Sequence, residues 1–509
     1  MSFQSISAHK LFLYLSALWF CFALVVMIFL GEQHVDEGYY HLIAHLTSEG
    51  KMPYIDYFYV QMPLYPLIYG FLFHLLGSSF LTGRGISACF ALCAFLLASR
   101  TARNVKGERA AAVTAGLLAC QPFTIYYLTI IKLYALTALL LTCFVWIMHS
   151  PLKPVYKTSL AVIFLSLASS VRLTVLPGLF ILLLIVFWRY RFSHVFITAA
   201  LTALLLLGMI ILPFYVFSPE TFTYGAFTYH FDKESFSLAR QFAHRLFTLS
   251  QLSQIYFNVI LLAAVTIAVN YSFRKTVPQH RISENTQDCL VVILTILFFH
   301  FTSQAPYVYR YLTILIPALT VLLGIESVRM EPKIQPHISG FRLSWIFAAS
   351  CFLTVLSRGA ADLGPLTGGG SAMMLANVST CISSVTSPGA PILTFNNSVA
   401  VEAQREVLSG DEMNVLTYDP EWTESRCEKY RVLNLDMLER AIKESRFGAI
   451  LLTSNSFLGN FPSFYNPGEI GARPRIMAAI STHYYKLKTF PGFGYMKEDA
   501  DLYLPRDHK

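Results

Sequence analysis

The chain has 509 residues, of which 55% are hydrophobic and only 13% carry a charge, and its mean hydropathy is +0.52. Soluble globular proteins carry about 25% charged residues, so this composition excludes that class and indicates an integral membrane protein. The net charge of +8 does not indicate nucleic-acid binding, because the basic residues lie mostly between apolar segments, where they set orientation.

Eleven apolar segments are candidates for membrane spans. The first, 11–30, has about the 20 residues needed to cross the hydrocarbon core, and no small-residue cleavage site marks it as a signal peptide. The others are 84–100, 110–126, 131–149, 158–171, 173–188, 195–213, 251–270, 288–303, 311–326 and 341–357. The sequence therefore predicts a polytopic α-helical membrane protein with about eleven transmembrane helices.

Alternate connections between these segments are rich in Lys and Arg. The basic residues gather at 100–109, 153–157, 189–191, 274–281 and 329–342, on the same side as Lys10. The positive-inside rule makes that side the cytoplasm. We therefore expect a cytoplasmic N-terminus, with the connection 31–83 and everything after residue 357 outside the cytoplasm.

The first external connection, 31–83, predicts two short helices lying in the membrane surface. In 38–49 apolar residues recur at helical spacing from Tyr39 to Leu46, and Gly50 is a plausible helix stop. The stretch 64–76 is apolar but, at about 13 residues, too short to span. A loop dense in Tyr, Phe and Pro joins the two.

The composition changes after Ser357. Glycines at 364 and 368–370 mark a flexible junction, and strands alternate with helices beyond it. The expected strands are 391–395, 448–453, 485–489 and 500–504, and the expected helices are 435–445 and 475–482. We therefore divide the chain into a transmembrane domain, 1–357, and a soluble extracytoplasmic α/β domain, 358–509. Cys381 and Cys427 lie in this second domain. A disulfide between them is compatible with a location outside the cytoplasm, but two cysteines alone are weak evidence for one.

Two adjacent acids, Asp36 and Glu37, follow the first span. One interpretation is that Asp36 caps the helix 38–49 while Glu37 favours its positive dipole end. The other is that one carboxylate is a general base for an acceptor hydroxyl. The two interpretations are compatible, because a cap fixes the direction of a carboxylate.

Four cations interrupt apolar segments near the predicted outer face, namely Arg84, Lys132, Arg172 and Arg310. A cation near the hydrocarbon is costly, so such residues usually face a cavity or pair with an anion. Snorkelling to lipid headgroups is the alternative, and we favour it for Arg84. For Arg172 and Arg310 we favour contact with a phosphate or a carboxylate, since arginine matches phosphate oxygens in a bidentate manner.

The aromatic loop contains Tyr54, Tyr57, Phe58, Tyr59 and Tyr65. An interfacial aromatic belt is one explanation, and a surface that holds a sugar or a lipid beside Asp36, Glu37 and Asp56 is another. His41 and His45 stand one helical turn apart, a spacing compatible with a metal, although surface solvation is the favoured interpretation.

The order of these motifs resembles the GT-C superfamily of membrane glycosyltransferases, in the bacterial branch related to protein O-mannosyltransferases and the lipid A aminoarabinose transferase. Asp36-Glu37 resembles the acidic pair of that family's first external loop. The segments that resemble other family signatures are Gly50-x-x-Pro53-Tyr54-x-Asp56-Tyr57-Phe58, Gln61-x-Pro63-Leu64-Tyr65, Ser170-Val171-Arg172-Leu173 and Arg310-Tyr311-x-x-x-x-Ile316-Pro317. Lys132-Leu133-Tyr134 departs from the family, where many relatives have arginine followed at two residues by an acid.

The resemblance implies an inverting glycosyltransferase in a bacterial inner or plasma membrane that moves a sugar from a polyprenyl-phosphate donor to a glycan, lipid or protein acceptor. Asp36, with Glu37 in second place, would be the catalytic base, and no metal or other cofactor is expected in the chemistry, although His41 and His45 leave metal dependence open. The residues expected to bind substrate are Lys132, Arg172, Arg310, Asp56, Tyr54, Tyr57, Tyr59, Gln61 and Tyr65. A transporter or flippase for a lipid-linked or anionic substrate is the alternative function, and the appended domain and the lack of an evident repeat argue against it.

Overall fold

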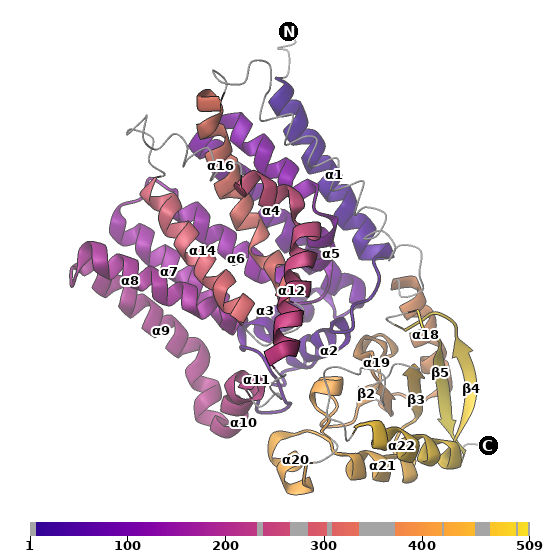
Figure 1. The fold of residues 1–509 in the computed structure, drawn as a ribbon. Coiled ribbons are helices and arrows are strands. Elements are labelled where there is room, and N and C mark those ends of the chain that lie inside the picture. Colours follow the sequence, from indigo (N-terminus) through magenta and orange to yellow (C-terminus); the bar gives the residue numbers. More distant parts are fainter. Residues whose placement is uncertain are drawn as a thin grey trace.

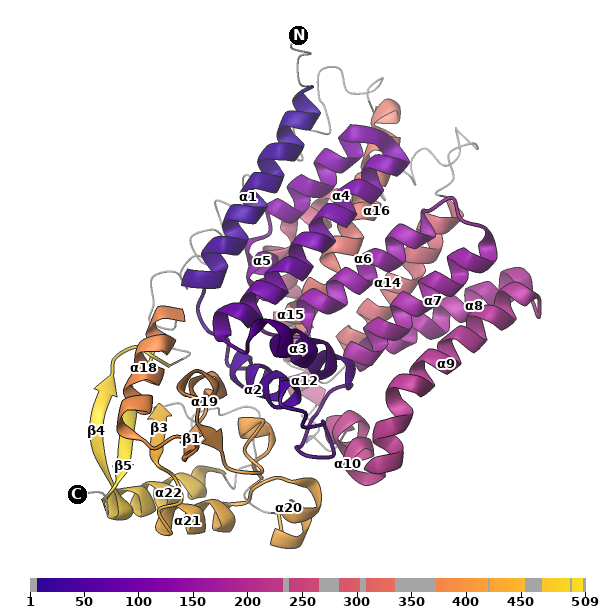
Figure 2. The same cartoon turned by 180° about the vertical axis from the view of Figure 1, so that it is seen from behind.

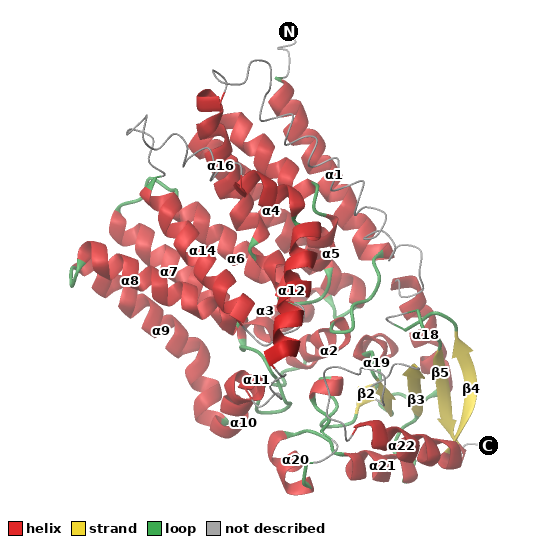
Figure 3. Ribbon diagram, in the orientation of Figure 1, coloured by secondary structure: helices red, strands yellow, loops and turns green. Residues whose placement is uncertain are grey.

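The computed structural model describes residues 7–231, 238–264, 283–302, 308–334, 372–419, 422–453, 469–494 and 497–506. These residues form a bundle of long helices joined at one end to a smaller part that contains a sheet (Figure 1). Figure 3 shows the strands of the described chain gathered in that smaller part. The N-terminal end of the first helix lies at the opposite end of the bundle from the sheet (Figures 1 and 2).

The long helices pack side by side in the bundle. They are α1 (Ala8–Leu30), α4 (Phe80–Ala119), α6 (Tyr134–Met148), α7 (Pro154–Val171), α8 (Leu176–Tyr190), α9 (His194–Phe217), α12 (Leu238–Ile255), α14 (Glu284–Thr302) and α16 (Ile316–Ile334). Short helical segments link them: α5 (Pro122–Thr129), η1 (Leu173–Val175), α10 (Pro219–Thr223), η2 (Tyr224–Thr228), α11 (Tyr229–Phe231), α15 (Val308–Tyr311) and η3 (Leu312–Ile314).

Five helices of the described residues are long and apolar enough to cross a membrane, or up to seven if each of two sharply bent helix pairs is one span. One of the five, α4, is itself broken at Lys106 and Gly107, where Gly107 adopts a φ of 77°. Arg109 Nε donates to His9 Nε2 (3.1 Å), so this basic turn lies at the N-terminal end of the bundle. The predicted segment 341–357 and the junction after Ser357 lie outside the described residues, so the total of eleven spans stays a prediction.

Two predicted spans differ from the observed helices. The segment 110–126 is interrupted at Gln121, because a residue before proline avoids the α conformation and Pro122 cannot donate a helical hydrogen bond. The short α5 that follows makes an angle of 110° with α6, so the turn 130–133 between them lies inside the bundle. The segment 251–270 is likewise broken, at an angle of 88°, between Ile255 and Phe257.

The two short helices predicted in the first external connection are present. They are α2 (Glu37–Ser48) and α3 (Leu64–Leu76), and Gly77 ends α3 with a φ of 87°. Both lie at the end of the bundle that faces the sheet (Figure 2).

The C-terminal residues form a five-stranded mixed sheet in the order β2-β1-β3-β5-β4. Its strands are β1 (Pro391–Thr394), β2 (Glu406–Val407), β3 (Ala449–Thr453), β4 (Tyr484–Phe490) and β5 (Ala500–Pro505). The helices of this part are α18 (Ala372–Val385), α19 (Asn397–Ala403), α20 (Glu424–Tyr430), α21 (Leu435–Lys443) and α22 (Glu469–His483). β1 is parallel to β2 and β3, whereas β5 is antiparallel to β3 and β4. The predicted strands and helices thus occur at the expected positions, whereas Cys381 and Cys427 are free thiols rather than a pair.

Candidate active site

Asp36 occupies the N-cap position of α2, yet its side chain makes no capping hydrogen bond. The carboxylate instead forms an ion pair with Lys132 and lies 3.7 Å from His34 Nδ1. The side chain is 26% exposed, so it connects a buried group of charges with the surface. The interpretation of Asp36 as a side-chain helix cap is therefore wrong.

The charges around Asp36 determine its protonation. Burial by itself would raise the pKa of the carboxyl, but Lys132, His34 and Arg310 together bring that pKa well below its usual value. The backbone N–H of Asp36 donates to His34 Nδ1 (3.1 Å), and burial, followed by Lys132, lowers the pKa of His34 far below its ordinary value. The resting site thus holds an ionised Asp36 beside a neutral His34.

Glu37 lies in very different surroundings, because its side chain is fully buried against Arg84. Arg84 Nε and Nη2 donate to its two oxygens at 2.9 and 2.7 Å. The backbone N–H groups of Ile131 (3.0 Å) and His34 (2.9 Å) donate to the same carboxylate. With four donors on two oxygens, Glu37 joins the two chain segments that carry Asp36 and Lys132, and a catalytic part for Glu37 stays a prediction.

Arg84 is not a snorkelling residue. Its side chain is fully buried, and besides Glu37 it donates to the carbonyl oxygens of Met27 (2.9 Å), Gly31 (2.8 Å) and Glu32 (2.9 Å). These acceptors end α1 and begin the loop that leads to Asp36. The preference for snorkelling at Arg84 is therefore wrong, and the residue anchors the loop from inside the bundle.

The other three predicted cations lie near Asp36. Lys132, in the turn between α5 and α6, has its Nζ 4.7 Å from the ring centre of Tyr134. Arg172, where α7 ends, lies over the rings of Tyr311 (4.2 Å) and Tyr134 (5.5 Å). Arg310 Nη1 is 3.4 Å from His34 Nε2. The structure thus brings Lys132, Arg172 and Arg310 together with Asp36, and we call these four residues with His34 and Tyr134 the Asp36 cluster.

The aromatic loop is packed more deeply than a sugar-holding surface requires. Tyr54, Tyr57, Tyr59 and Tyr65 are all buried. The Tyr54 ring contacts Phe214 and Phe222 with centroids 5.6 and 5.0 Å away, and its hydroxyl donates to the Gln61 carbonyl. Most of this loop is therefore buried core, which packs the connection 31–83 against α9 and α10.

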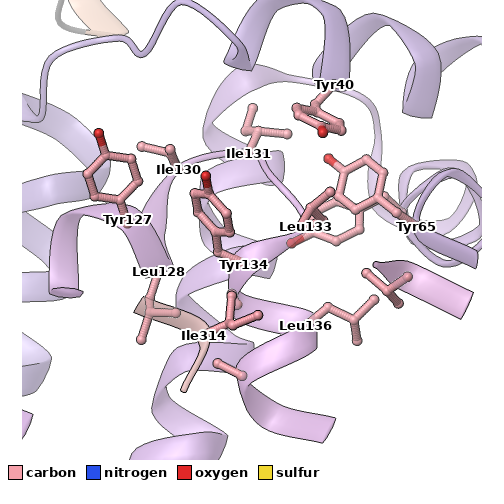
Figure 4. Packing of buried hydrophobic residues seen from close by; sticks show 14 of the residues in the cluster. Tyr40, Tyr65, Tyr127, Leu128, Ile130, Ile131, Leu133, Tyr134, Leu136 and Ile314 are labelled. Atoms are coloured by element: carbon pink, nitrogen blue, oxygen red, sulfur yellow. The ribbon is translucent and has the colours of Figure 1, made fainter. Parts of the chain in front are cut away.

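Two of the predicted binding residues lie differently from the rest. Tyr65 stacks on Tyr69 and meets the edge of Tyr40 at a centroid distance of 5.0 Å, next to the turn that carries Lys132 (Figure 4). Asp56 is exposed and accepts a hydrogen bond from the Met52 N–H (2.7 Å), which is a local turn contact. The structure therefore brings Tyr65 toward the Asp36 cluster and does not bring Asp56 there.

Comparison with solved structures identifies the fold of the chain. ArnT from Cupriavidus metallidurans, solved with undecaprenyl phosphate, matches with a TM-score of 0.60 and 13% identity over 97% of both chains. The oligosaccharyltransferase AglB from Archaeoglobus fulgidus, solved with an inhibitory peptide and dolichol phosphate, matches with a TM-score of 0.51 and 11% identity over 96% of this chain and 74% of that one. The mycobacterial arabinofuranosyltransferase AftD matches at 0.51 and 14% over 99% and 40%. All three are GT-C superfamily glycosyltransferases.

The chain has the GT-C fold. No protein-family model matches its sequence, and no curated protein matches it in sequence either. The GT-C resemblance that the motifs indicated is thus confirmed by the fold, at identities too low for sequence comparison to detect.

Three residues of this candidate site were not selected in the sequence analysis. His34 links Asp36 to Arg310, and the rings of Tyr134 and Tyr311 carry Lys132 and Arg172. Tyr134 had a signal, since it stands two residues after Lys132, where many relatives have an acid. His34 had only its position two residues before Asp36, which by itself predicts no contact with a residue almost three hundred positions away.

The sheet-containing part of the chain touches the connection 31–83 close to Asp36. Asn396 Nδ2 donates to Gln33 Oε1 (2.6 Å), and the Phe80 N–H at the start of α4 donates to Glu402 (2.6 Å). His41 bonds to Ser398 Oγ (3.2 Å) and the Ser78 carbonyl (2.7 Å), and burial lowers its pKa to about 3. His41 is therefore buried rather than solvated as predicted. His45 pairs with Ser78 and Glu49 and keeps 27% of its side chain exposed.

Proposed function

We propose that the chain is an inverting glycosyltransferase that moves a sugar from a polyprenyl-phosphate donor to an acceptor hydroxyl at the outer face of the membrane. The observation that carries this proposal is the contact of one partly exposed carboxylate, Asp36, with a group of largely buried cations. The fold supports a lipid-linked donor, because neighbours with that fold were solved with undecaprenyl phosphate and dolichol phosphate.

The cations are suited to a lipid phosphate. Lys132 and Arg172 are each less than a tenth exposed. Their charged groups lie over aromatic rings. A ring covers only one face of each charged group, so N–H donors of both side chains are available to an anion. A guanidinium binds phosphate oxygens through two parallel hydrogen bonds, whereas an ammonium acts as a point charge. We assign the donor phosphate to Lys132, Arg172 and Arg310.

Asp36 takes the role of the base. In the resting protein Lys132 lowers the pKa of Asp36 and so weakens it as a proton acceptor. A bound phosphate opposes the field of Lys132, which raises the pKa of Asp36 toward the range in which it accepts a proton. The base is thereby activated only when the donor is in place.

Transfer then follows a single displacement. The acceptor oxygen attacks the anomeric carbon, its proton passes to Asp36, and the bond between that carbon and the phosphate oxygen breaks, so the configuration inverts. The leaving polyprenyl phosphate carries two negative charges, and fixed cations stabilise charge that develops in this way. Because the leaving group is an anion of low basicity, no strong general acid is required.

Asp36→Asn tests the proposal. We expect transfer of labelled sugar from a polyprenyl-phosphate donor to native acceptors in membranes to fall by at least about 100-fold, since the base is lost. Glu49→Gln is the matched control, because Glu49 is a half-exposed acid at the other end of α2. Full activity of Asp36→Asn, with the control equally active, would remove Asp36 from the chemistry.

A further inference from the structure

Arg172 is held at the edge of its guanidinium group as well as over its face. The group lies over the rings of Tyr311 and Tyr134, which restrict the tilt of its plane. Rings alone leave a guanidinium group able to turn within that plane. Arg172 Nε, however, donates a hydrogen bond to Thr174 Oγ1 (3.1 Å), and this bond fixes the direction in which the group points.

The bond to Thr174 continues to a buried histidine on another helix. Thr174 lies in η1, and its Oγ1 is 3.0 Å from Nε2 of His300, a fully buried residue near the end of α14. His300 Nδ1 is 2.8 Å from the Ile296 carbonyl oxygen. Because a carbonyl oxygen only accepts, Nδ1 carries a proton, and Nε2 of the neutral imidazole is then an acceptor. The Thr174 hydroxyl therefore donates to His300 and accepts from Arg172.

The Thr174 hydroxyl is used differently from the hydroxyls of several threonines in the neighbouring helices. Each of those hydroxyls donates to the carbonyl oxygen four residues earlier in its own helix, as at Thr129, Thr137 and Thr142. Such a bond satisfies the hydroxyl locally and joins no two elements. Thr174 instead links Arg172, at the end of α7, to α14, so its two hydrogen bonds constrain where this cation lies.

The bond at Nε decides which donors Arg172 presents to a ligand. A guanidinium group binds an anion through two N–H groups, either Nε with one Nη or both Nη atoms together. Thr174 already accepts from Nε. Nη1 and Nη2 make no hydrogen bond or ion pair with the part of the chain that the structure describes. The two Nη atoms are therefore the pair that remains for an anion.

We propose that Thr174 and His300 are positioning residues, which hold Arg172 so that it binds the donor phosphate through Nη1 and Nη2. The inference rests on the proposed function, in which Arg172 contacts that phosphate. A donor group held in advance needs no reorientation when charge develops on the leaving phosphate, so it stabilises that charge more effectively. Thr174 and His300 act through Arg172 and do not themselves bind the phosphate.

Binding of labelled undecaprenyl phosphate to the purified full-length protein in nanodiscs tests the inference. Thr174→Val keeps the shape of the side chain and removes the hydroxyl, so we expect about five-fold weaker binding, the size of effect typical of one lost hydrogen bond. Thr174→Ser keeps the hydroxyl and should bind as tightly as the wild type. Thr142→Val is the matched control, because it makes the same change at a hydroxyl that bonds to the Ala138 carbonyl oxygen.

A double-mutant cycle distinguishes positioning from a general structural effect. Arg172→Met removes the guanidinium group, so Thr174→Val should cause no further loss of binding in that background. His300→Phe removes the acceptor for the Thr174 hydroxyl and should behave in the same way, weakening binding in the wild type but not in Arg172→Met. Additive losses would show that Thr174 and His300 only support the packing of α7 and α14, and would overturn the inference.

The outcomes separate the inference from the proposed function. If the wild type binds undecaprenyl phosphate and Thr174→Val binds it equally well, the positioning role is overturned while the donor class keeps its support. Failure of the wild type to bind undecaprenyl phosphate would overturn both.

Discussion

Asp36 and Glu37 are neighbours in the chain, yet their carboxylates have different surroundings. Glu37 accepts four hydrogen bonds and is fully buried, whereas Asp36 is partly exposed and faces a lysine. Adjacent residues at the start of a helix point in directions about 100° apart, so one carboxylate can enter the bundle while the other stays at its edge. We therefore propose that Glu37 holds the site in place and that Asp36 takes part in the chemistry.

Glu37→Gln should destabilise the protein far more than Asp36→Asn. Removing one partner of a buried ion pair leaves the other charge uncompensated, at a cost of about 3–5 kcal/mol, and Arg84 is fully buried. Thermal unfolding in detergent measures the difference between the two variants. A Glu37→Gln protein that is as stable as the wild type but inactive would instead give Glu37 a direct part in the reaction.

The buried carboxyl group of Glu412 should make the stability of the protein depend on pH. Burial raises its pKa to about 7, although the Gly410 N–H (3.0 Å) donates to it. The folded protein therefore keeps a proton that the unfolded chain loses above about pH 4.5, so stability falls as pH rises from about 5 to 7, by roughly 3 kcal/mol from this group. Glu412→Gln should flatten the change in unfolding temperature over that range. An unchanged pH profile in the variant would contradict the assignment.

At the scale of elements, the contact of α19 with α2 joins the sheet-containing part to the candidate site. A Cβ placed on Gly38 would lie 2.7 Å from the Asn397 backbone nitrogen, so the two helices approach as closely as a glycine permits. Glu402, at the other end of α19, accepts from the first N–H of α4, the helix that carries Arg84. Separation of α19 from α2 should therefore disturb the loop that holds Asp36.

Gly38→Ala makes this separation with one methyl group. We expect a loss of about 1–3 kcal/mol of stability, as for other overpacked sites, together with reduced transfer activity. Gly85→Ala is the matched control, because a Cβ at Gly85 has nothing within 4 Å. Unfolding temperature and labelled-sugar transfer are measured for both. Equal behaviour of the two variants would show that α19 does not constrain the site.

Some elements were predictable because their signals are local. The helix Leu64–Leu76 lies between Pro63 and Gly77, and the strands near residues 391 and 449 are short apolar runs bounded by turn residues. The helix break at Gln121 was not predicted, although Pro122 marks it. The mean hydropathy of the segment 110–126 is high, so the segment was taken as one uninterrupted span. Hydropathy averages over a span, whereas a kink depends on single residues.

The candidate site was predictable only in part. Lys132, Arg172 and Arg310 were found because a charge in an apolar segment is conspicuous, and Asp36 was found because it belongs to a pair of adjacent acids directly after the first span. The partner of Arg84 was not found, because its pairing with Glu37 joins residues 47 positions apart and depends on how the start of α2 lies against α4. The aromatic residues of the loop were assigned to a surface because composition does not distinguish a buried tyrosine from an interfacial one.

At the scale of the whole molecule, the loop between α1 and α2, which carries Asp36, lies where the helix bundle meets the sheet-containing part. The bundle supplies the cations of the Asp36 cluster, from the turn before α6, the C-terminal end of α7 and the short helix α15. The loop between α1 and α2 supplies the carboxylate, and the sheet-containing part packs against that loop. This arrangement suits a reaction between a lipid held in the membrane and an acceptor that arrives from the aqueous side.

A structure of the protein with undecaprenyl phosphate bound tests most directly whether the Asp36 cluster binds the donor phosphate. We expect phosphate oxygens within hydrogen-bond distance of Lys132, Arg172 and Arg310. We also expect the Asp36 carboxylate to turn away from Lys132, toward the position of the acceptor hydroxyl. A phosphate bound elsewhere on the bundle, with the contact between Asp36 and Lys132 unchanged, would contradict the central claim.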